Sequence, residues 1–232
     1  MGARALSQPD ALTGVVAALP VEARTVRRRK RSEWRVVTCG VGGERARLAA
    51  DRLVAQGVGR LLVWGTAGAL RADLQPGAVI LAHRVLDGHS VCYPVTAHWH
   101  TRLRTALRDT ADVNVGALVT VDRPVRDYAA KTELAHKTAA IAVDMEAAAV
   151  ARVAAENGLP FAAVRVIVDP LEQALPPVVL RAHAGRYMAA EVALRLLARP
   201  SDLPAVMALG RNMRVARRSL AIVARHLHAQ EG

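Results

Sequence analysis

The sequence predicts an α/β fold of three layers, in which helices cover both faces of a mixed, mostly parallel central sheet. Short apolar runs alternate with longer stretches of helical periodicity, which is typical of strands joined by crossover helices. The run at 161–168 is apolar almost throughout, as expected for a strand that is covered on both faces. With 232 residues, 52% of them hydrophobic, the chain can bury a full core.

The expected strands are short and are bounded by turn residues or by the start of a helix. They span 14–18, 35–39, 61–64, 79–82, 116–121, 141–143 and 161–168. Helices are expected from Pro20 onward and at 44–56, 101–108 and 145–157. The glycines at 65–68 are expected to form a turn after the strand 61–64, because turns that lead from a strand into a helix often carry glycine.

A short linker at 199–202 divides the chain into two expected parts. Residues 1–200 form the α/β domain, and residues 201–232 form a basic, amphipathic helical tail. The arginines of the tail are Arg211, Arg214, Arg217, Arg218 and Arg225. Two roles are open for this tail: its apolar residues pack on the domain, or the helix docks on an anionic membrane.

The charge balance is strongly basic, with a formal net charge of +12. Such a surface attracts anions, namely phosphate, nucleic acid or an acidic membrane. Aromatic residues make up only 3% of the chain and none interleave the basic run at 27–31, which argues against nucleic-acid binding by base stacking. We interpret that run as a solvated loop, with contact to anionic lipid or phosphate as the alternative.

The two cysteines, Cys39 and Cys92, form no disulfide framework and fit a reducing compartment. The chain has neither a signal-peptide pattern nor an apolar stretch long enough to span a membrane. We therefore expect a cytoplasmic protein, with peripheral contact at the inner membrane face left open. Cys92 and the histidines around it match no standard zinc spacing, so no metal is expected.

Three acidic residues follow expected strands, at the ends where open α/β sheets bind ligands. Glu22 follows the first strand, Glu146 follows 141–143, and Asp169 follows 161–168. Each has a structural alternative, because a carboxylate in the first turn of a helix offsets the helix dipole and an Asp before proline is common in turns. Their joint placement with the glycines at 65–68 favours a ligand site.

Several strings resemble the motifs of the methylthioadenosine/S-adenosylhomocysteine nucleosidases, in the nucleoside phosphorylase superfamily. In order along the chain they are VVAALPVE (15–22), GVG (40–42), GTAG (65–68), VDMEA (143–147) and VRVIVD (164–169). The pair Asp169-Pro170, the string ALPP (174–177) and the Arg-rich tail resemble the hopanoid-associated phosphorylases. That subfamily is implied to release adenine from adenosylhopane, in hopanoid biosynthesis.

The resemblance implies a role for each matching residue. Asp169 would protonate the purine at N7 as a general acid. Glu146 would hold the ribose hydroxyls, with Met145 against the sugar. Thr66 and Gly68 would bind the incoming water or phosphate, and Glu22 would orient this nucleophile. Gly65 begins the glycine motif to which Thr66 and Gly68 belong. The resemblance implies no cofactor other than phosphate as a co-substrate, and an oligomer of two or more copies.

The chain departs from the family in four places. Val168 stands where the nucleosidases usually carry a Ser, and no residue at 121–125 matches their aromatic base stacker. Val63-Trp64 and Glu22 stand where many phosphorylases carry Arg, which favours water over phosphate. Two alternatives stay open: a methylthioadenosine/S-adenosylhomocysteine nucleosidase, and a non-catalytic module that binds nucleosides or nucleic acid.

Overall fold

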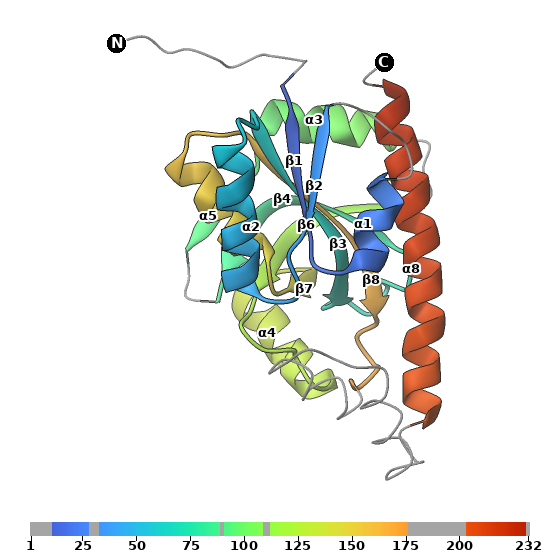
Figure 1. Cartoon of the computed structure of the whole chain (residues 1–232). Coiled ribbons are helices and arrows are strands. Elements are labelled where there is room, and N and C mark those ends of the chain that lie inside the picture. The colour runs from blue at the N-terminus through green and yellow to red at the C-terminus, as the bar shows by residue number, and fades with distance from the viewer. Residues whose placement is uncertain (1–10, 28–32, 89–90, 109–111, 176–202, 231–232) are drawn as a thin grey trace.

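The computed structural model describes residues 11–27, 33–88, 91–108, 112–175 and 203–230. Helices pack on both faces of a mixed sheet, which confirms the predicted fold class (Figure 1). The strands are β1 (Thr13–Ala17), β2 (Trp34–Thr38), β3 (Arg60–Ala69), β4 (Val79–Asp87), β5 (Cys92–Pro94), β6 (Val113–Thr120), β7 (Ala142–Asp144) and β8 (Phe161–Asp169). The helices are α1 (Pro20–Arg27), α2 (Gly43–Ala55), α3 (Ala97–Ala106), α4 (Tyr128–Thr138), α5 (Ala147–Glu156) and α8 (Leu203–Gln230).

The sheet contains two parallel groups that run in opposite directions. Strands β2, β1, β3 and β8 are parallel neighbours, and so are β4, β6 and β7. Because β8 pairs with both β3 and β4, while β3 pairs with β7, the strands β3–β7–β6–β4–β8 close into a ring. The site therefore forms where two strand groups of opposite direction meet.

Each face of the sheet carries its own large core cluster. Helices α2 and α5 cover one face with small side chains such as Ala50 and Ala151, which let the two helices approach closely. Helices α1, α3 and α8 cover the other face (Figure 1). This reliance on aliphatic packing is what an aromatic content of 3% predicts.

Helix α8 belongs to the same core as the sheet. Its buried residues pack with those of β4 and β8, and they are Ala216, Leu220, Val223, Ala224 and Leu227. The helix thus packs on the domain, while its arginines face outward. The expected boundary at residue 200 lies outside the described residues. In the part of the chain that is described, no helix is both long and apolar enough to cross a membrane.

Three sequence-based expectations about local structure were wrong or incomplete. The glycines at 65–68 form no turn, because β3 continues through them to Ala69 and pairs with β8 along its length. Helix α4 was not predicted, since Lys131 is its only buried side chain and it therefore lacks an apolar stripe. Strand β5, three residues long, was also not predicted.

Candidate active site

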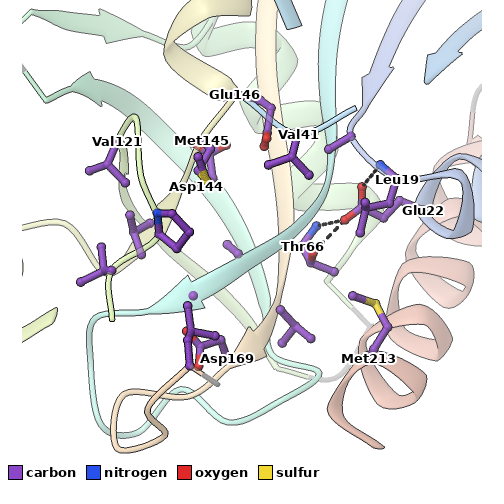
Figure 2. A pocket seen from close by; sticks show the side chains of 18 of the residues that line it. Leu19, Glu22, Val41, Thr66, Val121, Asp144, Met145, Glu146, Asp169 and Met213 are labelled. Atoms are coloured by element: carbon purple, nitrogen blue, oxygen red, sulfur yellow. Dashed lines mark hydrogen bonds between the residues drawn. The ribbon is translucent and has the colours of Figure 1, made fainter. Parts of the chain in front are cut away.

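A cavity of about 250 Å³ opens where β3, β7 and β8 end. It is lined by six of the seven residues that the sequence singled out: Glu22, Thr66, Gly68, Met145, Glu146 and Asp169. The seventh, Gly65, precedes Thr66 in β3. Figure 2 shows Glu22 with Thr66, Glu146 with Met145, and Asp169 on three different sides of the space.

The three acids do not converge for the reason that the sequence suggested. Strand β7, which leads to Glu146, runs antiparallel to β3 rather than parallel. Gly68 of β3 pairs with Val143 of β7 and with Asp169 of β8, and so brings the two strands to the same point. A Cβ atom at Gly68 would lie 3.2 Å from Val143 Cγ1 and 3.3 Å from Asp169 Oδ2, so only glycine fits there without displacement.

Glu22 is buried and held by three hydrogen bonds. Its Oε1 accepts from the backbone N of Thr66 at 2.9 Å and from the hydroxyl of Thr66 at 2.7 Å (Figure 2). Its Oε2 accepts from the backbone N of Leu19 at 2.9 Å, as the acid of a capping box does at the start of a helix. A Cβ atom at Gly65 would lie 2.8 Å from Oε2, so the glycine makes room for this carboxylate.

Glu146 occupies the N-cap position of α5 and reaches across to the start of α2. Its Oε1 accepts from the backbone N of Gly42 at 2.9 Å, and its Oε2 accepts from Nη2 of Arg165 at 3.0 Å. Burial raises the pKa of Glu146, and the positive charge of Arg165 opposes that rise. Each oxygen keeps a lone pair for a ligand hydroxyl.

Arg165 and Asp144 form a buried support behind Glu146. The guanidinium of Arg165 binds Asp144 through Nε at 2.9 Å and through Nη2 as well. Asp144 also accepts from the hydroxyl of Thr120 at 2.6 Å. We assigned neither residue a role from the sequence, although Arg165 is the one charge in an otherwise apolar strand, and such a charge needs a buried partner.

Asp169 is the last residue of β8 and is nearly buried. Its Oδ2 lies 2.9 Å from Nζ of Lys131, while its Oδ1 is buried without a hydrogen-bond partner among the described residues. Burial raises the pKa of Asp169 from 3.8 to about 6, although the ammonium of Lys131 lowers it. A carboxyl group with this pKa stays partly protonated near neutral pH. No pattern in the sequence singles out Lys131.

The remaining walls are largely apolar. Leu209 and Met213 of α8 form one side, with Leu175 nearby, and Val121 and Val125 form another. No aromatic side chain lines the cavity in the described part of the chain, and Phe161 is buried in the core as expected. The charged residues that line it are all acidic: Glu22, Asp144, Glu146 and Asp169. Within the described ranges, which leave out His89, no three His, Cys, Asp or Glu side chains group as a metal site.

A family model described as the phosphorylase superfamily matches residues 16–199. The chain belongs to the phosphorylase superfamily. This confirms the predicted superfamily and the predicted type of enzyme, a nucleoside phosphorylase or nucleosidase. No protein of curated function matches this phosphorylase-superfamily chain.

Solved structures share the fold at low sequence identity. Futalosine hydrolase of Helicobacter pylori is 16% identical with a TM-score of 0.73, over 94% of this chain and 97% of that one. The methylthioadenosine/S-adenosylhomocysteine nucleosidase of Neisseria meningitidis, in complex with methylthio-immucillin-A, is also 16% identical with a TM-score of 0.73, over 94% and 98%. The corresponding nucleosidase of Helicobacter pylori is 16% identical with a TM-score of 0.71, over 96% and 98%.

Proposed function

We propose that this chain is a nucleosidase, which hydrolyses the N-glycosidic bond of a purine nucleoside and releases adenine. One observation carries the proposal: Asp169, with a raised pKa and one unpartnered oxygen, faces a cavity that also holds Glu146 and Glu22. An acid, a group for the sugar and a group for the nucleophile are what glycoside cleavage needs. The low-identity neighbours that are nucleosidases or hydrolases are consistent with it.

In the proposed reaction the bond between C1′ and the base breaks, and its electron pair leaves with the base. Asp169 gives its proton to N7, so adenine departs neutral and the carboxylate remains. Positive charge develops on the sugar ring, where the ionised groups of the cavity stabilise it. Water adds to C1′ and releases its second proton to solvent.

Glu146 and Met145 are proposed to hold the ribose. Both oxygens of Glu146 are fixed by Gly42 and Arg165, so they accept the sugar hydroxyls without rearrangement. Met145 lies beside Glu146 on the cavity wall and offers an apolar surface to the sugar ring.

The charge of the cavity favours water over phosphate as the nucleophile. Thr66 and Gly68 of β3 are proposed to bind the water, which Glu22 orients. In the described residues no Lys or Arg side chain lines the cavity, and Glu22 stands beside the proposed nucleophile position. A phosphate dianion next to this buried carboxylate would be repelled, whereas water can donate to its free lone pairs.

For the 5′ substituent we propose a lipid, namely the hopanoid of adenosylhopane. Leu209 and Met213 of α8 give the cavity an apolar side, and Val41 at its edge is 37% exposed. On the outer side of α1 and α8 lies a groove of about 390 Å³ lined by four arginines that form no ion pair in the described part of the chain: Arg24, Arg214, Arg217 and Arg218. We propose that this groove binds anionic headgroups at the inner membrane face. The enzyme is proposed to be cytoplasmic and to form an oligomer of two or more copies.

The alternative is a nucleosidase for a small soluble substrate such as methylthioadenosine or S-adenosylhomocysteine. Neighbours with this activity share the fold, and one of them binds a methylthio-nucleoside analogue. This alternative leaves the basic groove without a role. A module that binds nucleosides without cleaving them is the third candidate, and the unpartnered oxygen of Asp169 argues against it.

The test measures adenine released from adenosylhopane in vesicles and from methylthioadenosine, each with and without phosphate. We expect adenine and a free ribosyl product from the lipid substrate, at a rate that does not depend on phosphate. A rate that requires phosphate would replace hydrolysis by phosphorolysis, and release from methylthioadenosine alone would favour the soluble substrate. No adenine from either would point to the binding module or to another nucleoside.

The membrane part has its own test. Changing Arg214, Arg217 and Arg218 to Gln should abolish pelleting with phosphatidylglycerol vesicles and leave the cleavage of detergent-dispersed adenosylhopane unchanged. Changing Arg47, Arg52 and Arg152, on the opposite face of the sheet, to Gln removes the same number of charges and is the control for total charge. Equal pelleting of both variants would exclude the groove as the membrane contact.

A further inference from the structure

Lys131 is a fully buried ammonium group on α4 whose three N–H bonds all have acceptors. Its Nζ lies 2.9 Å from Oδ2 of Asp169 and donates to the backbone oxygens of Pro170 at 2.7 Å and Gln173 at 3.0 Å. The side chain is 0% exposed. A buried lysine with this set of acceptors has no freedom to turn elsewhere.

No other charged group among the described residues competes for Asp169. Glu22 is bound to Thr66 and Leu19, and Glu146 to Gly42 and Arg165. Arg165 directs its guanidinium to the carboxylates of Asp144 and Glu146. On α4 itself, the nearby charges Glu133 and Lys137 pair with each other on the exposed side of the helix. Lys131 is therefore the one cation that acts directly on the proposed acid.

We propose that Lys131 is a positioning residue for Asp169: it binds Oδ2 and thereby leaves Oδ1 as the oxygen that carries the proton to the base. The proposal rests on the function proposed above. It also accounts for Val168, which stands where the nucleosidases that the sequence resembles usually carry a Ser. An ammonium on Oδ2 itself orients the carboxyl group, so no hydroxyl at position 168 is needed.

The same ion pair stabilises the product of the proton transfer. When Oδ1 has given its proton to N7, the new carboxylate stands 2.9 Å from a positive charge. Burial and Lys131 act on the pKa of Asp169 in opposite directions, and together they bring it to about 6. Without the ammonium, burial would act alone, and the pKa would lie higher.

Lys131 also fixes the chain that follows the acid. Through Pro170 and Gln173 it ties α4 to the segment that leads to Leu175, which lines the cavity. The backbone N of Leu175 in turn donates to the carbonyl of Arg126 at 2.9 Å. The side chain of Lys131 thus fixes the position of Asp169 relative to a neighbouring part of the cavity wall.

The experiment compares Lys131→Met and Lys131→Gln with Lys131→Arg, and uses Lys137→Met as the control on the same helix. Thermal melts first establish which variants fold. The pKa of the Asp169 carboxyl is then measured by ¹³C NMR titration, with Asp169→Asn to assign the signal, and the pH profile of adenine release is recorded. The NMR titration needs no substrate, so it stands even if the proposed function fails.

In the uncharged variants we expect the NMR titration and the alkaline limb of kcat to move up by about one pH unit or more. We expect kcat at its optimum to fall roughly 10- to 100-fold with little change in KM, since orientation is lost but ligand contacts are not. Lys131→Arg should restore the titration, and Lys137→Met should match the wild type. A folded Lys131→Met or Lys131→Gln protein whose Asp169 titrates at the wild-type pH would overturn the proposal. If the titration shifts in these variants but the wild-type protein releases no adenine, the proposed function is refuted and the role of the ion pair in setting the pKa of Asp169 is retained.

Discussion

Replacing Asp169 with Asn tests the proposed chemistry most directly. Asn has nearly the shape of Asp and leaves the cavity intact, but its amide has no acidic proton to give. The raised pKa sets the size of the effect. With a pKa of about 6, roughly one Asp169 in ten is protonated at about pH 7, against about one in 1,600 at the ordinary value of 3.8. Burial, net of the opposing effect of Lys131, thus multiplies the protonated form of Asp169 by about 150-fold.

Because the acid form of Asp169 is the active one, adenine release by the wild type should fall tenfold per pH unit above about pH 6. The Asn variant should lose the ~10²–10⁴-fold that general acid catalysis provides, and it should lose this alkaline limb. Adenine is quantified by chromatography between about pH 5 and 8. The nucleoside KM should stay near that of the wild type, since the ribose contacts are retained.

The matched control is Asp73→Asn, since Asp73 pairs with Arg71 on the surface. A thermal melt is needed alongside, because the Asn variant leaves the ammonium of Lys131 without a carboxylate. A folded Asp169→Asn enzyme that loses less than about tenfold in kcat, or that keeps the alkaline limb, would show that another group protonates the base.

Glu146→Gln should raise the nucleoside KM and lower kcat/KM about 10- to 100-fold, because a charge-assisted acceptor for the ribose is lost. Asp144 still neutralises Arg165 in this variant. Unchanged nucleoside kinetics would show that Glu146 does not bind the sugar. Gly68→Ala should lower kcat about 100-fold with a small change in melting temperature, because the new methyl group would lie 3.3 Å from Oδ2 of Asp169; full activity would contradict this steric argument. Leu220→Ala should reduce the free energy of unfolding by about 2–5 kcal/mol in urea titrations, since Leu220 is fully buried in the core under α8; a change near zero would mean that α8 is a dispensable tail.

Local patterns in the sequence predicted most of the strands and several of the helices. Strand 161–168 is recognisable because it is buried on both faces, and α2 because its apolar positions repeat at helical spacing. The three acids could be found because the strands were predicted and each acid stands within a few residues of a strand end. Family motifs then suggested their roles.

The features that the sequence did not reveal all depend on contacts between distant segments. Nothing near 65–68 indicates that β3 continues there, because the pairing that extends it comes from β8, about a hundred residues later. The same holds for the ring of strands, whose closure requires β8 to pair with both β3 and β4. It also holds for α8, whose apolar face becomes buried only by packing against the sheet.

Lys131 is the clearest case of what only the tertiary structure decided. On α4 it is one charged residue among several, and helical periodicity marks such a residue as exposed. In the fold it is fully buried, because Asp169 and two backbone carbonyls supply acceptors for each of its N–H bonds. The sequence by itself determined the layered α/β architecture and the three carboxylates, since both follow from local patterns. Which oxygen of Asp169 is free, and which cation tunes its pKa, depend on groups that are distant in the chain and meet only when the sheet closes.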